Sequence, residues 1–305
     1  MIKRTLYFGN PAYLSVKNHQ LVIHLPNARS MDDLTKQNTV PIEDIGIVIL
    51  DHSQITVTHT LMMELLANTA ALITCNEKHL PIGLFLPLEG HSTQTEKFRF
   101  QIQSSLPLKK NLWKQTVEQK ITNQANLLNR QGVDTECMFY WRKEIVSGDA
   151  NNCEARAAAY YWANLFKNKI PKFTRDRYGT PPNHLLNYGY ALLRAICARS
   201  LVGSGLLPTL GIHHRNKYNA YCLADDIMEP YRPYVDEVVL ELLHRYGIQQ
   251  SINKEQKIAL MTIPVVDVNI SGKTRPLMVA MSETTASLAA CFEGKNRTIK
   301  YPLLQ

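Results

Sequence analysis

The chain has 305 residues, of which 45% are apolar and 20% charged, and its formal net charge is +8 with neutral histidines. This composition is typical of a soluble globular protein of about two domains, and no apolar run approaches the roughly 18 residues that a membrane span needs. Lys3 and Arg4 resemble the start of a secretion signal, but Gly9, Asn10 and Pro11 interrupt the apolar stretch that should follow. The six scattered cysteines show no C-x-x-C spacing, which argues against a zinc cluster and favours a reducing, cytoplasmic setting.

The excess of positive charge is confined to the second part of the chain. Residues 1–92 carry six Lys or Arg against eight Asp or Glu, a net charge of −2, whereas residues 93–305 carry 28 against 18, a net charge of +10. This change predicts a boundary between a domain at 1–92 and a domain at 93–305. The second domain either attracts a polyanion such as DNA or simply has a solvated basic surface.

The first domain is predicted to be rich in β-strands. Residues 13–16 and 21–25 flank the polar residues 17–20, which predicts a hairpin with a longer loop. Leucine and methionine at residues 61–66 repeat at helical spacing, and Thr58 or Thr60 can cap this helix. Further strands are expected at residues 5–8, 45–50, 55–57, 71–75 and 82–86.

From Thr95 onward the apolar spacing becomes helical. Apolar residues mark a long amphipathic helix at 112–128, and Asn183, after two prolines, is expected to cap a helix that covers 185–196. Two more helices are predicted at 235–246 and 278–292. The second domain is therefore predicted to be all-α, and the fold class of the whole chain to be α+β.

A first candidate site lies at the start of a helix over residues 148–160. Asp149, Asn151 and Asn152 can cap this helix, and the alanines that follow leave little bulk around Glu154. Another backbone or a ligand can therefore approach the Glu154 carboxylate closely. Alternatively, Glu154 is only a first-turn acid that interacts favourably with the helix dipole.

A second candidate site lies at residues 211–230. On a helix, Asp226 and Glu229 are spaced i, i+3 and Asp225 and Glu229 are spaced i, i+4, so either pair can point two carboxylates the same way. Such like charges repel each other unless Arg232 or a divalent cation lies beside them. The alternative is an exposed acidic turn that arginines balance.

Together, these residues suggest a metal site. One glutamate, one imidazole from His213 or His214, and a carboxylate pair suit Mg²⁺ or Mn²⁺ better than a structural zinc ion. Such a metal can polarise a phosphodiester and stabilise the charge on attacking and leaving oxygens. Either histidine can instead be a hydrogen-bonded structural residue.

A basic stretch precedes the second candidate site. Its cations within eleven residues are Lys167, Lys169, Lys172, Arg175 and Arg177. Phe173 and Tyr178 are interleaved with them, a pattern that suits contacts with a phosphate backbone better than base readout. The alternative is a solvated loop.

Over nearly its whole length the sequence resembles the CRISPR-associated integrase of the adaptation machinery, the first-numbered Cas protein, in its type II branch. The most specific similarity lies at residues 152–158 (NCEARAA), 186–190 (LNYGY) and 211–236, which includes LADDIMEPYRP at 223–233. Residues 41–45 (PIEDI) are also similar to this family.

The resemblance implies an N-terminal β-sandwich, a helical catalytic domain and a homodimer built largely through the first domain. It also implies that two such dimers are bridged by one dimer of a small ferredoxin-like adaptation partner. Glu154, His214 and Glu229 match the catalytic metal ligands of the family, and Asp226 would support or join the coordination. His213 is the neighbouring alternative to His214.

The implied activity is metal-dependent strand transfer, in which the 3′-hydroxyl of a short prespacer duplex attacks a phosphodiester at the leader–repeat junction of a CRISPR array. Water in place of that hydroxyl would give endonuclease activity. The candidates for phosphate contacts are Arg156, Lys172, Arg175, Arg177, Arg215 and Lys217. The two alternatives are a repair nuclease without integration and a non-catalytic DNA-binding scaffold.

Overall fold

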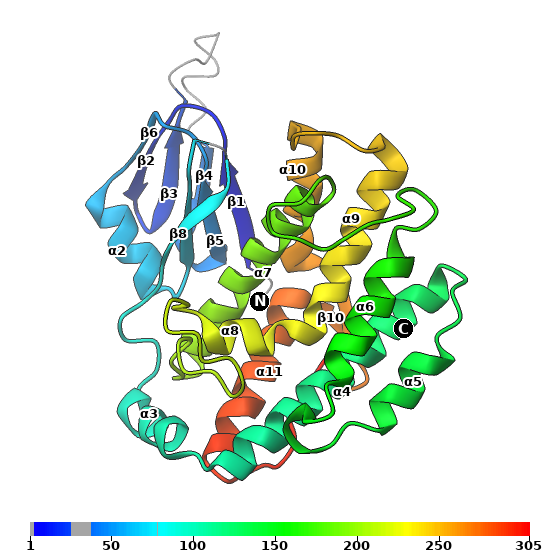
Figure 1. Ribbon diagram of the computed structural model, residues 1–305. Coiled ribbons are helices and arrows are strands. Elements are labelled where there is room, and N and C mark those ends of the chain that lie inside the picture. Colours follow the sequence, from blue (N-terminus) through cyan, green and yellow to red (C-terminus); the bar gives the residue numbers. More distant parts are fainter. Residues whose placement is uncertain (1–2, 26–37, 78) are drawn as a thin grey trace. The chain divides into compact units, whose positions relative to one another are not determined.

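The computed structural model describes residues 3–25, 38–77 and 79–305, and the chain divides into two compact units, residues 1–90 and 91–305 (Figure 1). The division lies two residues before the boundary expected from the sequence. Unit 1 is β-rich and unit 2 is mostly helical, as the predicted α+β fold requires.

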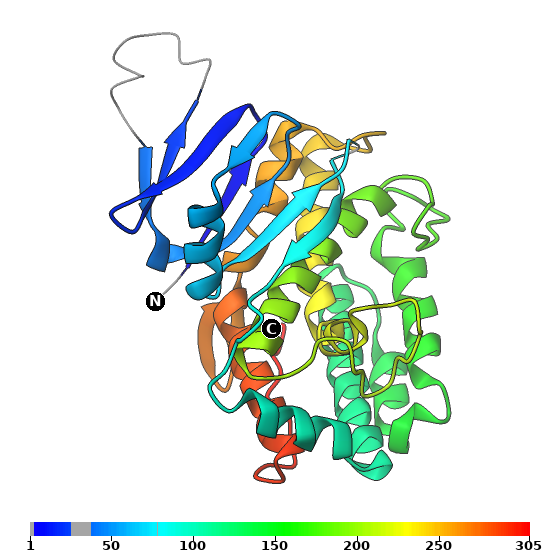
Figure 2. The same cartoon turned by 90° about the vertical axis from the view of Figure 1, so that its left-hand side faces the viewer.

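The described residues of unit 1 form two four-stranded sheets and one α-helix. The first sheet has the order β1 (Arg4–Phe8), β5 (Ile45–Leu50), β7 (Ala71–Cys75), β8 (Pro81–Phe85), in which only β8 is antiparallel to its neighbour. The second sheet has the order β4 (Asn38–Pro41), β3 (Gln20–His24), β2 (Ala12–Lys17), β6 (Ile55–Val57). Both sheets and helix α2 (His59–Ala67) contribute to one apolar core, and Figure 2 shows α2 lying along the strands.

The β2–β3 hairpin is tighter than the sequence pattern predicts. Lys17 pairs directly with Gln20, so the loop consists of Asn18 and His19 alone. Their φ values of 52° and 57° give the left-handed two-residue turn that matches the twist of paired strands. The expected longer loop is therefore wrong. Of the two candidate caps of α2, Thr58 is the one used, because its hydroxyl accepts a hydrogen bond from the Leu61 N–H.

Unit 2 is built from helices of very different length, together with three short 3₁₀ turns, of which the first two carry or precede site residues. Its α-helices are α3 (Gln94–Gln103), α4 (Leu106–Arg130), α5 (Glu136–Lys143), α6 (Cys153–Leu165), α7 (Asn183–Gly203), α8 (Cys222–Ile227), α9 (Arg232–Tyr246), α10 (Lys254–Leu260) and α11 (Leu277–Phe292). Its 3₁₀ turns are η2 (Ser147–Asp149), η3 (Glu229–Tyr231) and η4 (Ile263–Val265). No helix in the described part of the chain is long and apolar enough to cross a membrane.

Unit 2 is not all-α, because it also holds the hairpin β9 (Asp267–Ile270) and β10 (Lys273–Pro276). Ser271 and Gly272 form its two-residue turn with φ values of 52° and 73°. The Ser-Gly pair after the buried Val268 and Ile270 is the turn signal that helical periodicity overlooks.

Helix α4 places the candidate site, because it packs against both α6 and η3. The buried amide of Asn123 donates hydrogen bonds to the carbonyl oxygens of Pro230 (2.7 Å) and Pro302 (3.0 Å). Its oxygen accepts one from the Leu304 N–H. One fully buried side chain thus ties η3, which begins with Glu229, and the C-terminal segment to the long helix.

Candidate active site

Glu154 lies in the first turn of α6, where a carboxylate from the preceding turn fixes the backbone. The Asp149 side chain accepts hydrogen bonds from the N–H groups of Cys153 (2.9 Å) and Glu154 (3.0 Å). Asn152 stands at the cap position with φ 56° but makes no side-chain cap, and Asn151 instead donates to the Glu144 carbonyl. Of the three predicted caps, only Asp149 serves the helix.

Glu154 and Glu229 meet at one ammonium group. The Nζ atom of Lys120, on α4, lies 2.6 Å from Oε1 of Glu154 and 2.6 Å from Oε2 of Glu229. The other oxygen of Glu229 accepts a hydrogen bond from Nε of Arg232 (2.9 Å). Two glutamates that lie far apart in sequence therefore share a single cation.

The charges around Glu229 keep it ionised although it is buried. Burial opposes the ionisation of this carboxyl, but Arg232 and Lys120 outweigh that effect and lower its pKa to about 2. Burial also disfavours the Lys120 ammonium, yet Glu229 and Glu154 raise its pKa above the ordinary value. Glu229 and Lys120 therefore stabilise each other's charged forms.

Arg232 contacts Glu229, as the sequence predicted. Lys120 is a second positive partner, which the sequence analysis missed. It lies three residues after the apolar Val117 on the same helix, and its side chain is 11% exposed. A lysine at a buried helical position is the one signal that could have drawn attention to it, since lysine is rarely buried without a partner.

His214 is held by Asp226, a buried carboxylate on α8. Oδ1 of Asp226 lies 2.5 Å from Nδ1 of His214, and the carboxylate also accepts hydrogen bonds from the N–H groups of His213 and His214. The contact occupies Nδ1 and leaves Nε2 as the nitrogen that can bind a ligand. The hydrogen bond to Asp226 raises the pKa of His214.

The neighbouring His213 has different surroundings. Its ring stacks on Trp113 of α4 at 4.2 Å between centroids and an interplanar angle of 5°. Burial lowers the pKa of His213. Among the described residues, a carboxylate contacts the ring of His214 but not that of His213.

The acidic residues of segment 225–229 do not form the helical pairs that their spacing allows. Helix α8 ends at Ile227 and a 3₁₀ turn begins at Glu229, so the two carboxylates are not on one continuous helix. Asp225 binds Arg194 at 2.6 Å and Asn219 at 2.7 Å. Each carboxylate of the segment thus has separate partners, and Asp226 is engaged by the histidine loop.

The residues fit a hard divalent cation in their chemistry, although Lys120 lies between two of them. Among residues 3–25, 38–77 and 79–305, no three His, Cys, Asp or Glu side chains lie close enough together to hold a metal. Oε2 of Glu229 is nevertheless buried and accepts no well-aligned hydrogen bond, despite the nearby ammonium. Two carboxylates, one of them with an unsatisfied oxygen, and one imidazole nitrogen form the donor set that Mg²⁺ or Mn²⁺ accepts.

The predicted phosphate contacts differ in exposure. Arg175 is partly buried and donates to Oδ1 of Asn183 (2.9 Å) and Oδ1 of Asn187 (2.7 Å). Asn183 therefore anchors the preceding loop and does not cap α7 as the sequence suggests. The exposed candidates are Arg156, Lys172, Arg177, Arg215 and Lys217.

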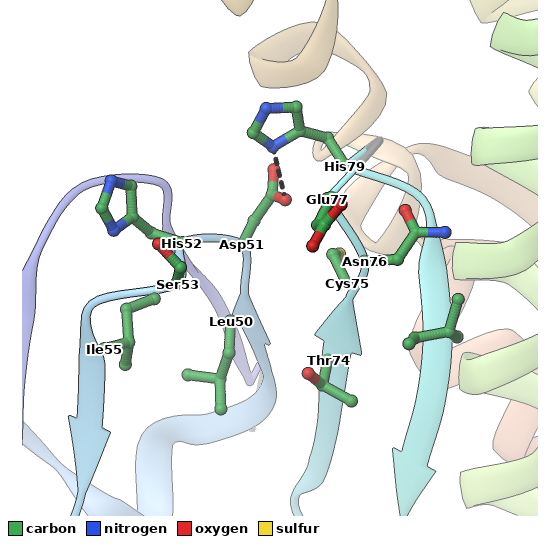
Figure 3. A pocket seen from close by; sticks show the side chains of 11 residues that line it. Leu50, Asp51, His52, Ser53, Ile55, Thr74, Cys75, Asn76, Glu77 and His79 are labelled. Carbon is green, nitrogen blue, oxygen red and sulfur yellow. Dashed lines mark hydrogen bonds and ion pairs between the residues drawn. The ribbon is translucent and has the colours of Figure 1, made fainter.

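Unit 1 has a separate polar cavity of about 970 Å³ beside the ends of β5 and β7 (Figure 3). The buried Asp51 accepts a hydrogen bond from the Tyr7 hydroxyl (2.6 Å) and lies 2.8 Å from Nδ1 of His79. The cavity shares no residue with the Glu154 cluster, and the sequence analysis contained no sign of it.

Comparison with known proteins identifies the family of the chain. Residues 6–263 match the family model described as CRISPR associated protein Cas1. The CRISPR-associated endonuclease Cas1 of Neisseria meningitidis serogroup C is 35% identical over 305 residues, which cover 99% of this chain and 96% of that protein.

Solved structures share the fold at low sequence identity. A casposase bound to integration product has a TM-score of 0.79 at 18% identity and covers 98% of this chain and 92% of its own. A Cas1 protein from Thermotoga maritima has a TM-score of 0.73 at 16% identity, covering 96% and 98%. Chains of a Cas6-RT-Cas1–Cas2 complex and of a Cas1–DNA complex are also similar, with TM-scores of 0.73 and 0.62. The chain therefore belongs to the Cas1 family of CRISPR-associated proteins, and the relative that matches it over almost its full length is named an endonuclease.

Proposed function

We propose that this protein is a CRISPR adaptation integrase of the type II branch, which joins the 3′-hydroxyl of prespacer DNA to the leader–repeat junction and also cleaves DNA. The observation that carries the proposal is the meeting of Glu154 and Glu229 at one cation, beside a histidine that Asp226 orients. The assignment to the type II branch rests on the sequence segments 152–158 and 223–233.

Glu154, Glu229 and Nε2 of His214 would hold Mg²⁺ or Mn²⁺, which supplies electrostatic stabilisation of the reacting phosphate. Asp226 orients the imidazole and fixes which nitrogen faces a ligand. Arg232 holds one oxygen of Glu229, so that the other is presented in a fixed direction. Asp149 fixes the first turn of α6 and with it the position of Glu154.

The DNA would bind to the basic unit 2. The exposed cations Arg156, Lys172, Arg177, Arg215 and Lys217 suit backbone phosphates, whereas Arg175 holds the loop that precedes α7. Unit 1 would form the homodimer, and two dimers would flank a dimer of a small ferredoxin-like partner. The similarity to chains of a Cas1–Cas2 complex and a Cas1–DNA complex supports these partners.

Strand transfer into a plasmid tests the proposal. A labelled short duplex with a free 3′-hydroxyl is mixed with a supercoiled plasmid that carries a leader and repeat, in Mn²⁺ or EDTA, with and without the small partner. We expect joining that needs metal and disappears with Glu154→Gln. Cleavage without joining would instead support a repair nuclease. DNA binding that is indifferent to EDTA, with no joining, would support a non-catalytic scaffold.

A further inference from the structure

We propose that Lys120 is a built-in counter-ion of the active site, which a divalent metal must displace, so that this lysine sets how tightly the site binds metal. The inference rests on the proposed function, because it assumes that the metal binds to Glu154 and Glu229. It concerns a residue on α4 that lies outside the segments of most specific similarity to the family, residues 152–158, 186–190 and 211–236.

The ammonium and a metal would need the same atoms. Lys120 contacts Oε1 of Glu154 and Oε2 of Glu229, each at 2.6 Å. A magnesium or manganese ion between these carboxylates would bind their oxygens at about 2.1 Å. An ammonium that stayed in contact with both oxygens would lie almost against the metal, and two cations at that separation repel strongly. The two cations therefore exclude each other.

Without metal, Lys120 balances the charge of Glu154 as well as part of the charge of Glu229. Arg232 reaches Glu229, whereas the ion pair of Glu154 in the described part of the chain is with Lys120. The ammonium thus allows two carboxylates to come together in the folded protein before a metal arrives. Loss of this cation would leave the carboxylate pair with a stronger attraction for any divalent ion.

The displaced ammonium has an acceptor close by. A cavity of about 120 Å³ borders Lys120, Glu229 and Gln124, which lies one turn further along α4. Oε1 of Gln124 is buried and has no hydrogen-bond partner among the residues that the structure describes. Residues four apart on a helix are neighbours, so the Lys120 side chain can reach this oxygen by a change of rotamer. Arg175 and Arg232 also border the cavity, and Asp236 lies there to offset their charge.

The experiment measures Mn²⁺ affinity of the full-length protein by titration calorimetry without DNA. We expect Lys120→Met to bind Mn²⁺ roughly tenfold more tightly or better than the wild type, because a competing charge a few ångströms away is gone. Lys114→Met is the matched control. It removes the same charge from the same helix, but its lysine forms a looser, partly exposed pair with Glu118 at 3.7 Å. Its affinity should equal that of the wild type.

Two further variants keep the test decisive if Lys120→Met folds poorly. Lys120→Gln should also bind Mn²⁺ more tightly, because it keeps the length of the side chain but not the charge. Lys120→Arg keeps the charge and should bind Mn²⁺ no more tightly than the wild type. Melting in EDTA and in Mn²⁺ gives a second readout, in which the metal raises the melting temperature of Lys120→Gln more than that of the wild type.

The inference is overturned if neutral variants at Lys120 bind Mn²⁺ as the wild type does or more weakly, or if Lys114→Met tightens binding equally. It is also overturned if Lys120→Arg binds more tightly than the wild type. Mn²⁺ binding by the Glu154→Gln variant distinguishes a wrong role for Lys120 from a wrong metal site. If Glu154→Gln leaves Mn²⁺ binding unchanged, the proposed metal site itself fails. If it abolishes binding while Lys120 variants have no effect, only the role of Lys120 fails.

Discussion

Asp225 and Asp226 are adjacent in sequence but contact different partners. Asp226 is completely buried and bonds the ring and backbone of the His214 loop, whereas Asp225 binds Arg194 and Asn219. The spacing of carboxylates along the sequence could not reveal this division, because it depends on where the helix ends. Only the folded chain shows which acid faces the imidazole.

The two aspartates therefore make a matched pair of variants. Asp226→Asn should lower both Mn²⁺ affinity and strand transfer by roughly 10- to 100-fold, as loss of the partner of a metal-binding histidine commonly does. Asp225→Asn removes a neighbouring carboxylate and should reduce thermal stability with much smaller losses of metal binding. Calorimetry and the strand-transfer assay on both proteins check this. Equal metal affinities of the two variants would contradict the role given to Asp226.

Arg175 is predicted to stabilise the fold, whereas Arg177 is predicted to bind DNA. Arg177 is exposed, so Arg177→Ala should weaken DNA binding modestly for all DNA sequences. The slope of the logarithm of the DNA-binding constant against the logarithm of the salt concentration should become less steep by about one. Arg175→Ala should instead destabilise the fold by about 1–3 kcal/mol, because Asn183 and Asn187 lose their donor. Salt-dependent binding curves and chemical denaturation check these outcomes. If the salt dependence of DNA binding decreases more for Arg175→Ala than for Arg177→Ala, the roles given to the two arginines are reversed.

At the scale of elements, a buried carboxylate joins three helices of unit 2. Asp236 of α9 accepts hydrogen bonds from Tyr161 of α6 (2.7 Å) and Tyr190 of α7 (2.5 Å). Burial raises the pKa of Asp236 to about 6, although these hydrogen bonds and two arginines oppose the shift. Its folded-state pKa therefore exceeds the unfolded value, which is unusual for an aspartate in contact with donors.

This shift predicts the direction of a pH effect. Between the unfolded pKa of about 4 and the folded pKa of about 6, the folded protein binds more protons at Asp236, so this residue's contribution to stability falls as the pH rises. The unfolding free energy of the wild type relative to Asp236→Asn should drop by about 3 kcal/mol over this window, at about 1.4 kcal/mol per pKa unit. Urea denaturation of both proteins at pH 4, 5, 6 and 7 measures it. A difference that rises with pH would refute the assignment.

The sequence predicted most elements but not how they meet. The spacing of apolar residues located α4, α7, α9, α11 and the strands of unit 1 other than β4, because these depend on local patterns, whereas β4, β9 and β10 were not predicted. Two-residue turns with positive φ were missed at residues 18–19 and 271–272, since Asn-His and Ser-Gly are weaker signals than Asn-Gly. Lys120 was missed because it lies 34 residues from Glu154, and its buried position on the helix does not by itself indicate which residues it contacts.

At the scale of the whole molecule, the charge division of the sequence coincides with two structural units. The β-rich unit 1 is proposed to form the dimer, and the Glu154 cluster lies entirely in unit 2. We therefore expect light scattering to give about twice the chain mass of 34.7 kDa in both EDTA and Mn²⁺. A mass of one chain at micromolar concentration, or a dimer that dissociates when metal is removed, would contradict this organisation.

The position of the metal itself decides the central claim. Crystals of the full-length protein are soaked in Mn²⁺, and anomalous scattering at the manganese edge locates the ion. We expect one peak bonded to Glu154, Glu229 and Nε2 of His214, with Nδ1 of His214 still on Asp226 and the Lys120 ammonium displaced from the two carboxylates. No peak at saturating Mn²⁺, or a peak elsewhere with Lys120 still between Glu154 and Glu229, would contradict the account.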